Sequence, residues 1–182
     1  ANRETPGIGA EWQRKLGERD QFTLSTQYSQ PRYPTQDTQD TDQVLLSASW
    51  LHIFEGKTTP LIFASVNQSV DRALRPLATG SDMSRTTTGV RAHFQLTPLA
   101  HMDVFLSAGV SRRNDDSLNA RSALTPPVYG RDLTKDVSIG VNWRPWPKWT
   151  VKGQLAAYQN DSNLELYQFR RTESTISARY DF

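Results

Sequence analysis

The sequence predicts an all-β protein made of consecutive antiparallel strands, and three observations support this. Apolar and polar residues alternate with period two through most of the chain, whereas helical periodicity is hard to find. The segments between the alternating stretches are short and long in turn. Hydrophobic residues make up only 36% of the 182 residues and the mean hydropathy is −0.63, so we do not expect a large packed core.

About nine segments carry the alternation. Residues of one parity are apolar and their neighbours are polar, which places the two kinds on opposite faces of a strand. The predicted strands are, in chain order, Ile8–Leu16, Phe22–Tyr28, Val44–Phe54, Ile62–Val70, Val90–Leu96, Met102–Val110, Val137–Trp143, Trp149–Ala157 and Arg170–Phe182.

Each predicted strand has an apolar face. Its residues are, strand by strand, Ile8, Ala10, Trp12 and Leu16; Phe22, Leu24 and Tyr28; Val44, Leu46, Ala48 and Trp50; Ile62, Ala64 and Val66; Val90, Ala92, Phe94 and Leu96; Met102, Val104, Leu106, Ala108 and Val110; Val137, Ile139, Val141 and Trp143; Val151, Leu155 and Ala157; and Ile176, Ala178, Tyr180 and Phe182. The residues between them are mostly Ser, Thr, Gln, Asn or charged.

The connections alternate in length. The short ones are LGERDQ, FEGKTTP, LTPLA and RPWPKW, and the long, polar ones are SQPRYPTQDTQDTD, DRALRPLATGSDMSR, RRNDDSLNARSALTPPVYGRDLTKD and YQNDSNLELYQFR. Short turns at one end and long loops at the other are typical of bacterial outer-membrane barrels.

Aromatic residues gather near both ends of the predicted strands. Those expected near the short turns are Phe22, Phe54, Phe94, Trp143, Trp146, Trp149 and Phe182, and those expected near the long loops are Tyr28, Tyr33, Tyr129, Tyr158, Tyr167 and Phe169. Two such belts are expected where a barrel meets the two membrane interfaces.

The composition excludes several other classes. No run of about 18 apolar residues occurs, which excludes a transmembrane helix. The absence of Cys excludes disulfides, thiolate metal sites and Cys nucleophiles. The net charge is +2 and the basic residues are scattered, so no nucleic-acid partner is expected. The sequence opens with ANRETPGIG and not with a signal-peptide pattern, so we expect a mature chain or a fragment.

The fold class predicted from these patterns is a transmembrane antiparallel up-and-down β-barrel in the outer membrane of a Gram-negative bacterium, with residues 1–182 as one domain. An even strand number is usual, and the first and last predicted strands run in the same direction, so we expect at least one strand before Ala1 and a larger intact barrel. The alternative is a soluble β-sandwich or a lipocalin-like barrel, with its apolar residues inside.

The last strand resembles the C-terminal β-signal that the barrel-assembly machinery reads in outer-membrane proteins. The residues that match are Ile176, Ala178, Tyr180 and Phe182. The ending NDSNLELYQFRRTESTISARYDF is also similar to the last hairpin of barrels joined to periplasmic tetratricopeptide repeats. Those families include exopolysaccharide exporters and surface lipoprotein assembly modifiers, so the resemblance implies the assembly machinery and a periplasmic repeat region as partners.

Ionisable residues on the polar face are candidates for lining a lumen. They are Glu11, Lys15, Arg91, His93, Asp103, Arg113, Lys152, Arg171, Glu173, Arg179 and Asp181. Such charges either guide a hydrated solute or pair with one another across strands. We therefore expect a porin-like, non-enzymatic conduit for a polar substrate, with exopolysaccharide secretion as the leading hypothesis and the lipid bilayer and lipopolysaccharide as partners.

Two other functions remain open. One is the assembly or translocation of surface lipoproteins. The other is a barrel-embedded hydrolase, because a turn centred on Pro98 would place His93 opposite Asp103 and could orient the imidazole as a general base. We expect that pair to be structural, and we expect no catalytic residue, cofactor or metal site. His52 and His101 lack the spacing of metal ligands.

Overall fold

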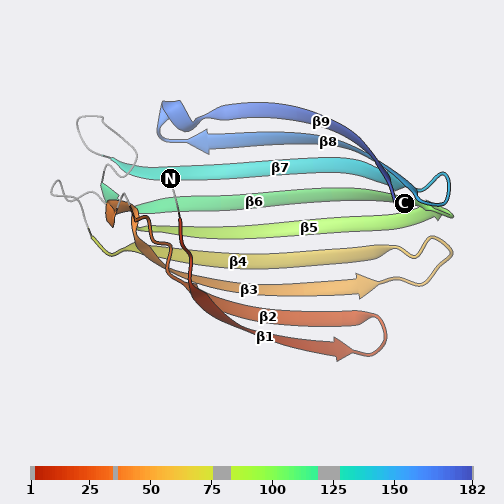
Figure 1. Ribbon diagram of the computed structural model, residues 1–182, viewed down its shortest axis with the longest axis horizontal. Coiled ribbons are helices and arrows are strands. Elements are labelled where there is room, and N and C mark those ends of the chain that lie inside the picture. Colours follow the sequence, from red (N-terminus) through yellow and green to blue (C-terminus); the bar gives the residue numbers. More distant parts are fainter. Residues whose placement is uncertain (1–2, 35–36, 76–82, 119–127, 182) are drawn as a thin grey trace.

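The computed structural model describes residues 3–34, 37–75, 83–118 and 128–181. These residues form one antiparallel sheet in which nine strands lie side by side in chain order (Figure 1). The elements are β1 (Gly7–Leu16), β2 (Asp20–Ser29), η1 (Asp37–Gln39), β3 (Thr41–Ile53), β4 (Leu61–Ala73), β5 (Arg85–Leu99), β6 (Met102–Leu118), β7 (Tyr129–Trp143), β8 (Trp149–Ser162), η2 (Glu165–Tyr167) and β9 (Phe169–Tyr180).

The all-β prediction is confirmed, and each predicted strand is present. The strands are longer than predicted on the long-loop side: β5 begins at Arg85, β6 runs on to Leu118 and β7 begins at Tyr129. Beyond the apolar stretch both faces are polar, so the alternation ends while the backbone ladder continues. The long loops are correspondingly shorter than the sequence predicts.

The strand register gives the sheet two chemically different faces. Directly opposed residues share a face, and one continuous row of them runs from Trp12 in β1 through Leu24, Ala48, Val66, Val90 and Val110 in β2 to β6. We call the side of the sheet that carries this row the apolar face. The opposite side, with Glu11, Ser25, Ser47 and Asn67, is the polar face.

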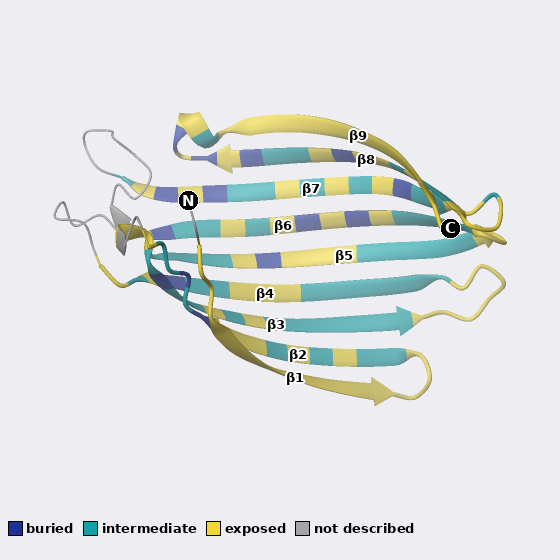
Figure 2. Cartoon of the chain, in the orientation of Figure 1, coloured by how far each residue is buried: buried dark blue, intermediate teal, exposed yellow. Residues whose placement is uncertain are grey.

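Burial is inverted relative to an ordinary soluble domain (Figure 2). Among the described residues, the only buried hydrophobic side chains are Ala156 and Leu164. The buried polar residues are Ser29, Thr41, Asp71, Ser107, Asp115, Asp132, Asn160 and Ser162, and the strand register places all of them on the polar face. Large apolar side chains such as Trp12, Ile139 and Leu155 are exposed on the apolar face.

The apolar residues form a band that crosses the sheet obliquely. The register row that starts at Trp12, in the middle of the β1 band, ends in β9 at Arg170, whereas the β9 band is centred on Ala178. The band therefore shifts by about eight residues across the sheet, or about one residue per strand. With the usual rise along a strand and spacing between strands, that shift corresponds to a strand tilt of about 35° relative to the band.

β1 and β9 are the two edges of the sheet, and within the described residues they do not pair with each other. Both are exposed along their whole length because each has a neighbour on one side only (Figure 2). In the described residues, no helix has the length and the apolar content that crossing a bilayer requires.

Candidate functional site: the polar face of the sheet

The polar face carries the charged residues that the sequence singles out. Register places the following of them there: Glu11, Lys15, Arg91, His93, Asp103, Arg113, Lys152, Arg171, Glu173 and Arg179. Asp181 follows β9, donates its backbone N–H to the carbonyl of Lys148 and accepts a hydrogen bond from Arg179 Nε at 2.6 Å. These side chains come from several different strands and form one surface.

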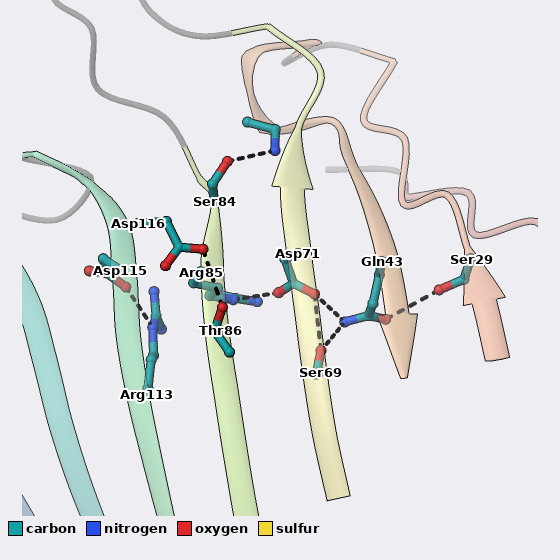
Figure 3. Close-up of polar contacts among 11 residues, drawn as sticks. Ser29, Gln43, Ser69, Asp71, Ser84, Arg85, Thr86, Arg113, Asp115 and Asp116 are labelled. Atoms are coloured by element: carbon teal, nitrogen blue, oxygen red, sulfur yellow. Dashed lines mark hydrogen bonds and ion pairs between the residues drawn. The ribbon is translucent and has the colours of Figure 1, made fainter. Parts of the chain in front are cut away.

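A hydrogen-bonded network crosses the polar face near the long loops (Figure 3). The buried carboxylate of Asp71 accepts hydrogen bonds from Arg85 Nε at 2.5 Å, Gln43 Nε2 at 2.7 Å and Ser69 Oγ at 3.2 Å. Ser29 Oγ donates to Gln43 Oε1 at 3.2 Å, which extends the network to β2. It therefore ties four adjacent strands together at this end of the sheet.

Farther along the polar face, an ion pair passes over a glycine. Arg91 in β5 and Asp136 in β7 both lie beside Gly109 in β6, and Arg91 Nη2 is 2.7 Å from Asp136 Oδ1. Arg91 Nη1 also donates to the buried Ser107 Oγ at 3.1 Å. A Cβ on Gly109 would lie 2.7 Å from Asp136 Oδ1 and 2.8 Å from Arg91 Nη2, so the absence of a side chain makes room for the pair.

Gly109→Val is expected to displace this ion pair and lower the free energy of unfolding by about 1–2 kcal/mol. In the background of Arg91→Met, the same substitution should cost much less because the crowded guanidinium is gone. Equilibrium urea unfolding followed by tryptophan fluorescence measures both. Gly153→Val is the matched control, since a Cβ there meets only Val141 Cγ1 at 3.6 Å; equal costs of Gly109→Val with and without Arg91 would contradict the assignment.

The other charges are also satisfied locally. Three ion pairs join residues two apart on one strand or at its end, namely Arg113–Asp115, Arg171–Glu173 and Arg179–Asp181. By contrast Glu11, Lys15 and Lys152 are exposed or partly exposed. The polar face thus offers many hydrogen-bonding groups. Most of its charged side chains are paired with an opposite charge within the protein.

The predicted opposition of His93 and Asp103 is wrong. His93 lies opposite Ser107, and its ring stacks on that of Phe105 at 5.7 Å between centroids. Asp103 accepts a hydrogen bond from Thr97 Oγ1 at 2.7 Å and lies 3.1 Å from Arg144 Nη2. The turn lies at Ala100 and His101, between the paired Leu99 and Met102, and not at Pro98, so the two side chains are separated along the sheet.

The polar face also carries an apolar patch that the sequence pattern does not predict. Leu51, Phe63 and Phe105 lie there near the short turns, opposite Gln21, His93 and Gly140 respectively. At these positions both faces of the strand are apolar, so simple alternation gives no signal. The signal that could have indicated this patch is an aromatic residue opposite a glycine, because the Phe105 ring covers Gly140.

The aromatic belt predicted near the long loops is wrong for two residues. Tyr158 and Phe169 lie on the polar face, and the guanidinium of Arg171 lies 5.0 Å from the Tyr158 ring centroid and 6.0 Å from that of Phe169. Near the short turns, Phe22, Phe94, Trp143 and Trp149 lie on the apolar face as predicted. Of the β-signal residues, Ile176, Ala178 and Tyr180 are on the apolar face, and Phe182 lies outside the described residues.

His52 and the residues around it form a structural cluster on the apolar face. His52 Nδ1 and Trp50 Nε1 each lie 2.8 Å from Asp20 Oδ1. Within the part of the chain that the structure describes, no group of three or more His, Asp or Glu side chains is arranged to hold a metal ion.

The fold and the polar face define this protein as an all-β chain with one nine-stranded antiparallel meander sheet. A comparison with protein-family models gives no match, and a search of curated proteins gives no significant one.

Proposed function

We propose that this chain forms a β-barrel, or a section of one, in a bacterial outer membrane, and that its polar face lines a conduit for a polar polymer such as a secreted exopolysaccharide. The observation that carries the proposal is the inverted burial, with apolar side chains exposed in an oblique band and polar ones buried on the opposite face. Lipid is the solvent that stabilises such a surface.

The energetics favour lipid over water around the apolar face. Each exposed side chain the size of Leu or Ile costs about 1.5–3 kcal/mol relative to burial, and contiguous apolar surface of this extent is rare on soluble monomers. The soluble alternative would bury the apolar face inside the fold. Within the described residues this face is left open, and a strand tilt of about 35° is the tilt expected of a membrane barrel.

The polar face suits a moving, hydrated chain. Its hydroxyl and amide groups can make many weak hydrogen bonds, and its paired charges attract neither cations nor anions strongly. Aromatic rings such as Tyr158 and Phe63 on this face could stack on sugar rings. The similarity of the last hairpin to those of exopolysaccharide exporters supports the same substrate class.

The apolar patch of Leu51, Phe63 and Phe105 favours a second function, the translocation of surface lipoproteins. An acylated substrate needs apolar contacts along its route, and a purely polar conduit does not offer them. The hydrolase hypothesis depended on a pair of His93 and Asp103, and these residues are not opposite each other in the sheet.

The proposal is tested with single cysteines in this naturally cysteine-free chain. Ser65→Cys places a thiol on the polar face, and the adjacent Val66→Cys places one on the apolar face. Each variant is reconstituted into liposomes that contain a labelled neutral oligosaccharide. We expect a bulky, charged thiol reagent to modify the Ser65→Cys variant and slow its efflux severalfold. The Val66→Cys variant should remain unmodified, with its efflux unchanged.

The outcomes separate the hypotheses. Equal modification of both variants would overturn the barrel. Modification of the Ser65→Cys variant without any effect on oligosaccharide efflux would reject the conduit but keep the membrane fold. Transfer of an acylated peptide that Phe63→Ser abolishes, with oligosaccharide efflux unaffected, would favour the lipoprotein function.

A further inference from the structure

Two depressions lie end to end on the apolar face over β7, β8 and β9. The first, toward the long loops, is lined on this face by Lys135, Gln159 and Arg170, with Val137, Ala157 and Thr172 directly below them. The second continues toward the short turns between Ile139, Leu155 and Ile176. A polar end therefore joins an apolar groove along the same three strands.

The polar end is cationic. Lys135, Gln159 and Arg170 form one register row, the first row beyond the apolar band on the long-loop side. Arg112 and Arg131 lie on the same face one and two rows farther along. Four cations thus gather here, and the nearby carboxylates on this face are Asp161 and Asp116.

Asp161 offsets only part of this charge. Its carboxylate lies 3.0 Å from Lys135 Nζ and accepts a hydrogen bond from Gln159 Nε2 at 2.7 Å. Outside the apolar band, the hydrogen bonds from Gln159 and Lys135 hold the pKa of Asp161 below its usual range, so it is ionised at neutral pH. Even so, the cations outnumber the carboxylates, and Arg170 projects at the exposed edge of the row.

The apolar end is a groove because small residues separate large ones. Gly153 and Ser174 lie on the apolar face between the exposed Ile139, Leu155 and Ile176. A Cβ placed on Gly153 meets only Val141 Cγ1, at 3.6 Å, so the space above this glycine is open. The groove extends across the strands from Val104 in β6 to Ile176 in β9, and together with the polar depression beside it covers several successive rows of the apolar face.

We propose that these two depressions form one binding site for a phosphorylated, multiply acylated glycolipid, the lipid A part of lipopolysaccharide. Its phosphate would contact Lys135 and Arg170, and an acyl chain would fill the groove over Gly153. The inference rests on the proposed outer-membrane function, in which the long-loop end faces outward and lies in the lipopolysaccharide leaflet. The pairing of cations with an apolar groove directly below them fits a lipid phosphate better than a free one.

The test is lipid binding by the refolded full chain in neutral detergent, measured by native mass spectrometry with purified diphosphoryl lipid A. Arg170→Gln and Lys135→Gln should each weaken binding about fivefold, the effect of one cation near an anionic lipid surface. Arg179→Gln and Lys152→Gln are the matched controls, because these cations lie on the polar face and line neither depression; they should change affinity less than about twofold. Gly153→Leu, which fills the groove, should also weaken binding.

Each of the following outcomes either supports or overturns the proposed lipid site. Wild type should bind dephosphorylated lipid A as weakly as the Lys135→Gln/Arg170→Gln double variant binds the diphosphoryl form. Equal loss in Arg179→Gln, or no loss in the double variant, overturns the site. Phosphatidylglycerol bound as tightly, with the same dependence on Arg170, would assign the groove to phospholipid instead, and pairing of two protein chains abolished by Gly153→Leu would assign it to a second copy.

Flotation with liposomes, measured on the same preparations, distinguishes failure of the lipid site from failure of the membrane proposal. If the chain floats but its lipid A binding ignores Lys135 and Arg170, only the lipid site fails. If the chain does not float, the membrane proposal fails and the lipid site fails with it.

Discussion

Leu155→Arg is expected to lower the free energy of unfolding from a bilayer by about 2–4 kcal/mol, the cost of an arginine on the lipid face near the midplane. Leu155 is 55% exposed on the apolar face, near the middle of the β8 band. Urea titration of the chain in liposomes, followed by tryptophan fluorescence, measures the change.

Gln154→Arg is the matched control because the adjacent residue points to the polar face. There an arginine meets water and other polar groups, so we expect a change within about 0.5 kcal/mol. In a soluble protein the order would be different: an exposed Leu155 could become Arg at little cost and with better solubility. A Leu155→Arg variant as stable as wild type in liposomes would therefore refute the membrane proposal.

The second large effect is expected from Arg85→Met at the long-loop end of the polar face. The Asp71 side chain is only 5% exposed, and Arg85 is its cationic partner at 2.5 Å. Removing one member of a buried ion pair leaves an uncompensated charge, at a cost of about 3 kcal/mol. Gln43 and Ser69 still donate to the carboxylate but carry no charge.

A double variant isolates the charge effect. Asp71→Asn in the Arg85→Met background should recover most of the lost stability, because the neutral amide no longer needs the guanidinium. Arg72→Met, next to Asp71 but on the opposite face and exposed, should cost less than about 0.5 kcal/mol. Unfolding in urea gives all these values, and an unrecovered double variant would show that Arg85 acts by packing alone.

The sequence predicts the face of a strand residue well, but it does not predict which side chains meet across the sheet. The alternation in β7 is sufficient to place Ile139 and Val141 on one face and Ser138 and Asn142 on the other, and the structure agrees. The alternation does not predict which charged residues pair with one another. Arg91 bonds to Asp136 two strands away, and that contact requires both the register of three strands and the missing side chain of Gly109.

The failures have two different origins. His93 and Asp103 were expected to be opposite each other about a turn centred on Pro98, whereas the turn lies farther along the chain, between the paired Leu99 and Met102. Tyr158 and Phe169 were assigned to a membrane belt by residue type, yet their parity puts them on the polar face beside Arg171. The position of a turn depends on backbone hydrogen bonds that residue type specifies only weakly. The face of Tyr158, by contrast, follows from its parity in β8, which an assignment by residue type ignores.

The alternation of apolar and polar residues is enough to show that the chain is all-β and which face most strand residues occupy, because the side of a strand on which a residue lies depends only on its parity along the backbone. The tertiary structure alone decided how far the strands extend, how obliquely the apolar band runs, and which side chains meet across the sheet. Those features depend on the register between strands, where hydrogen bonds join residues distant in the sequence.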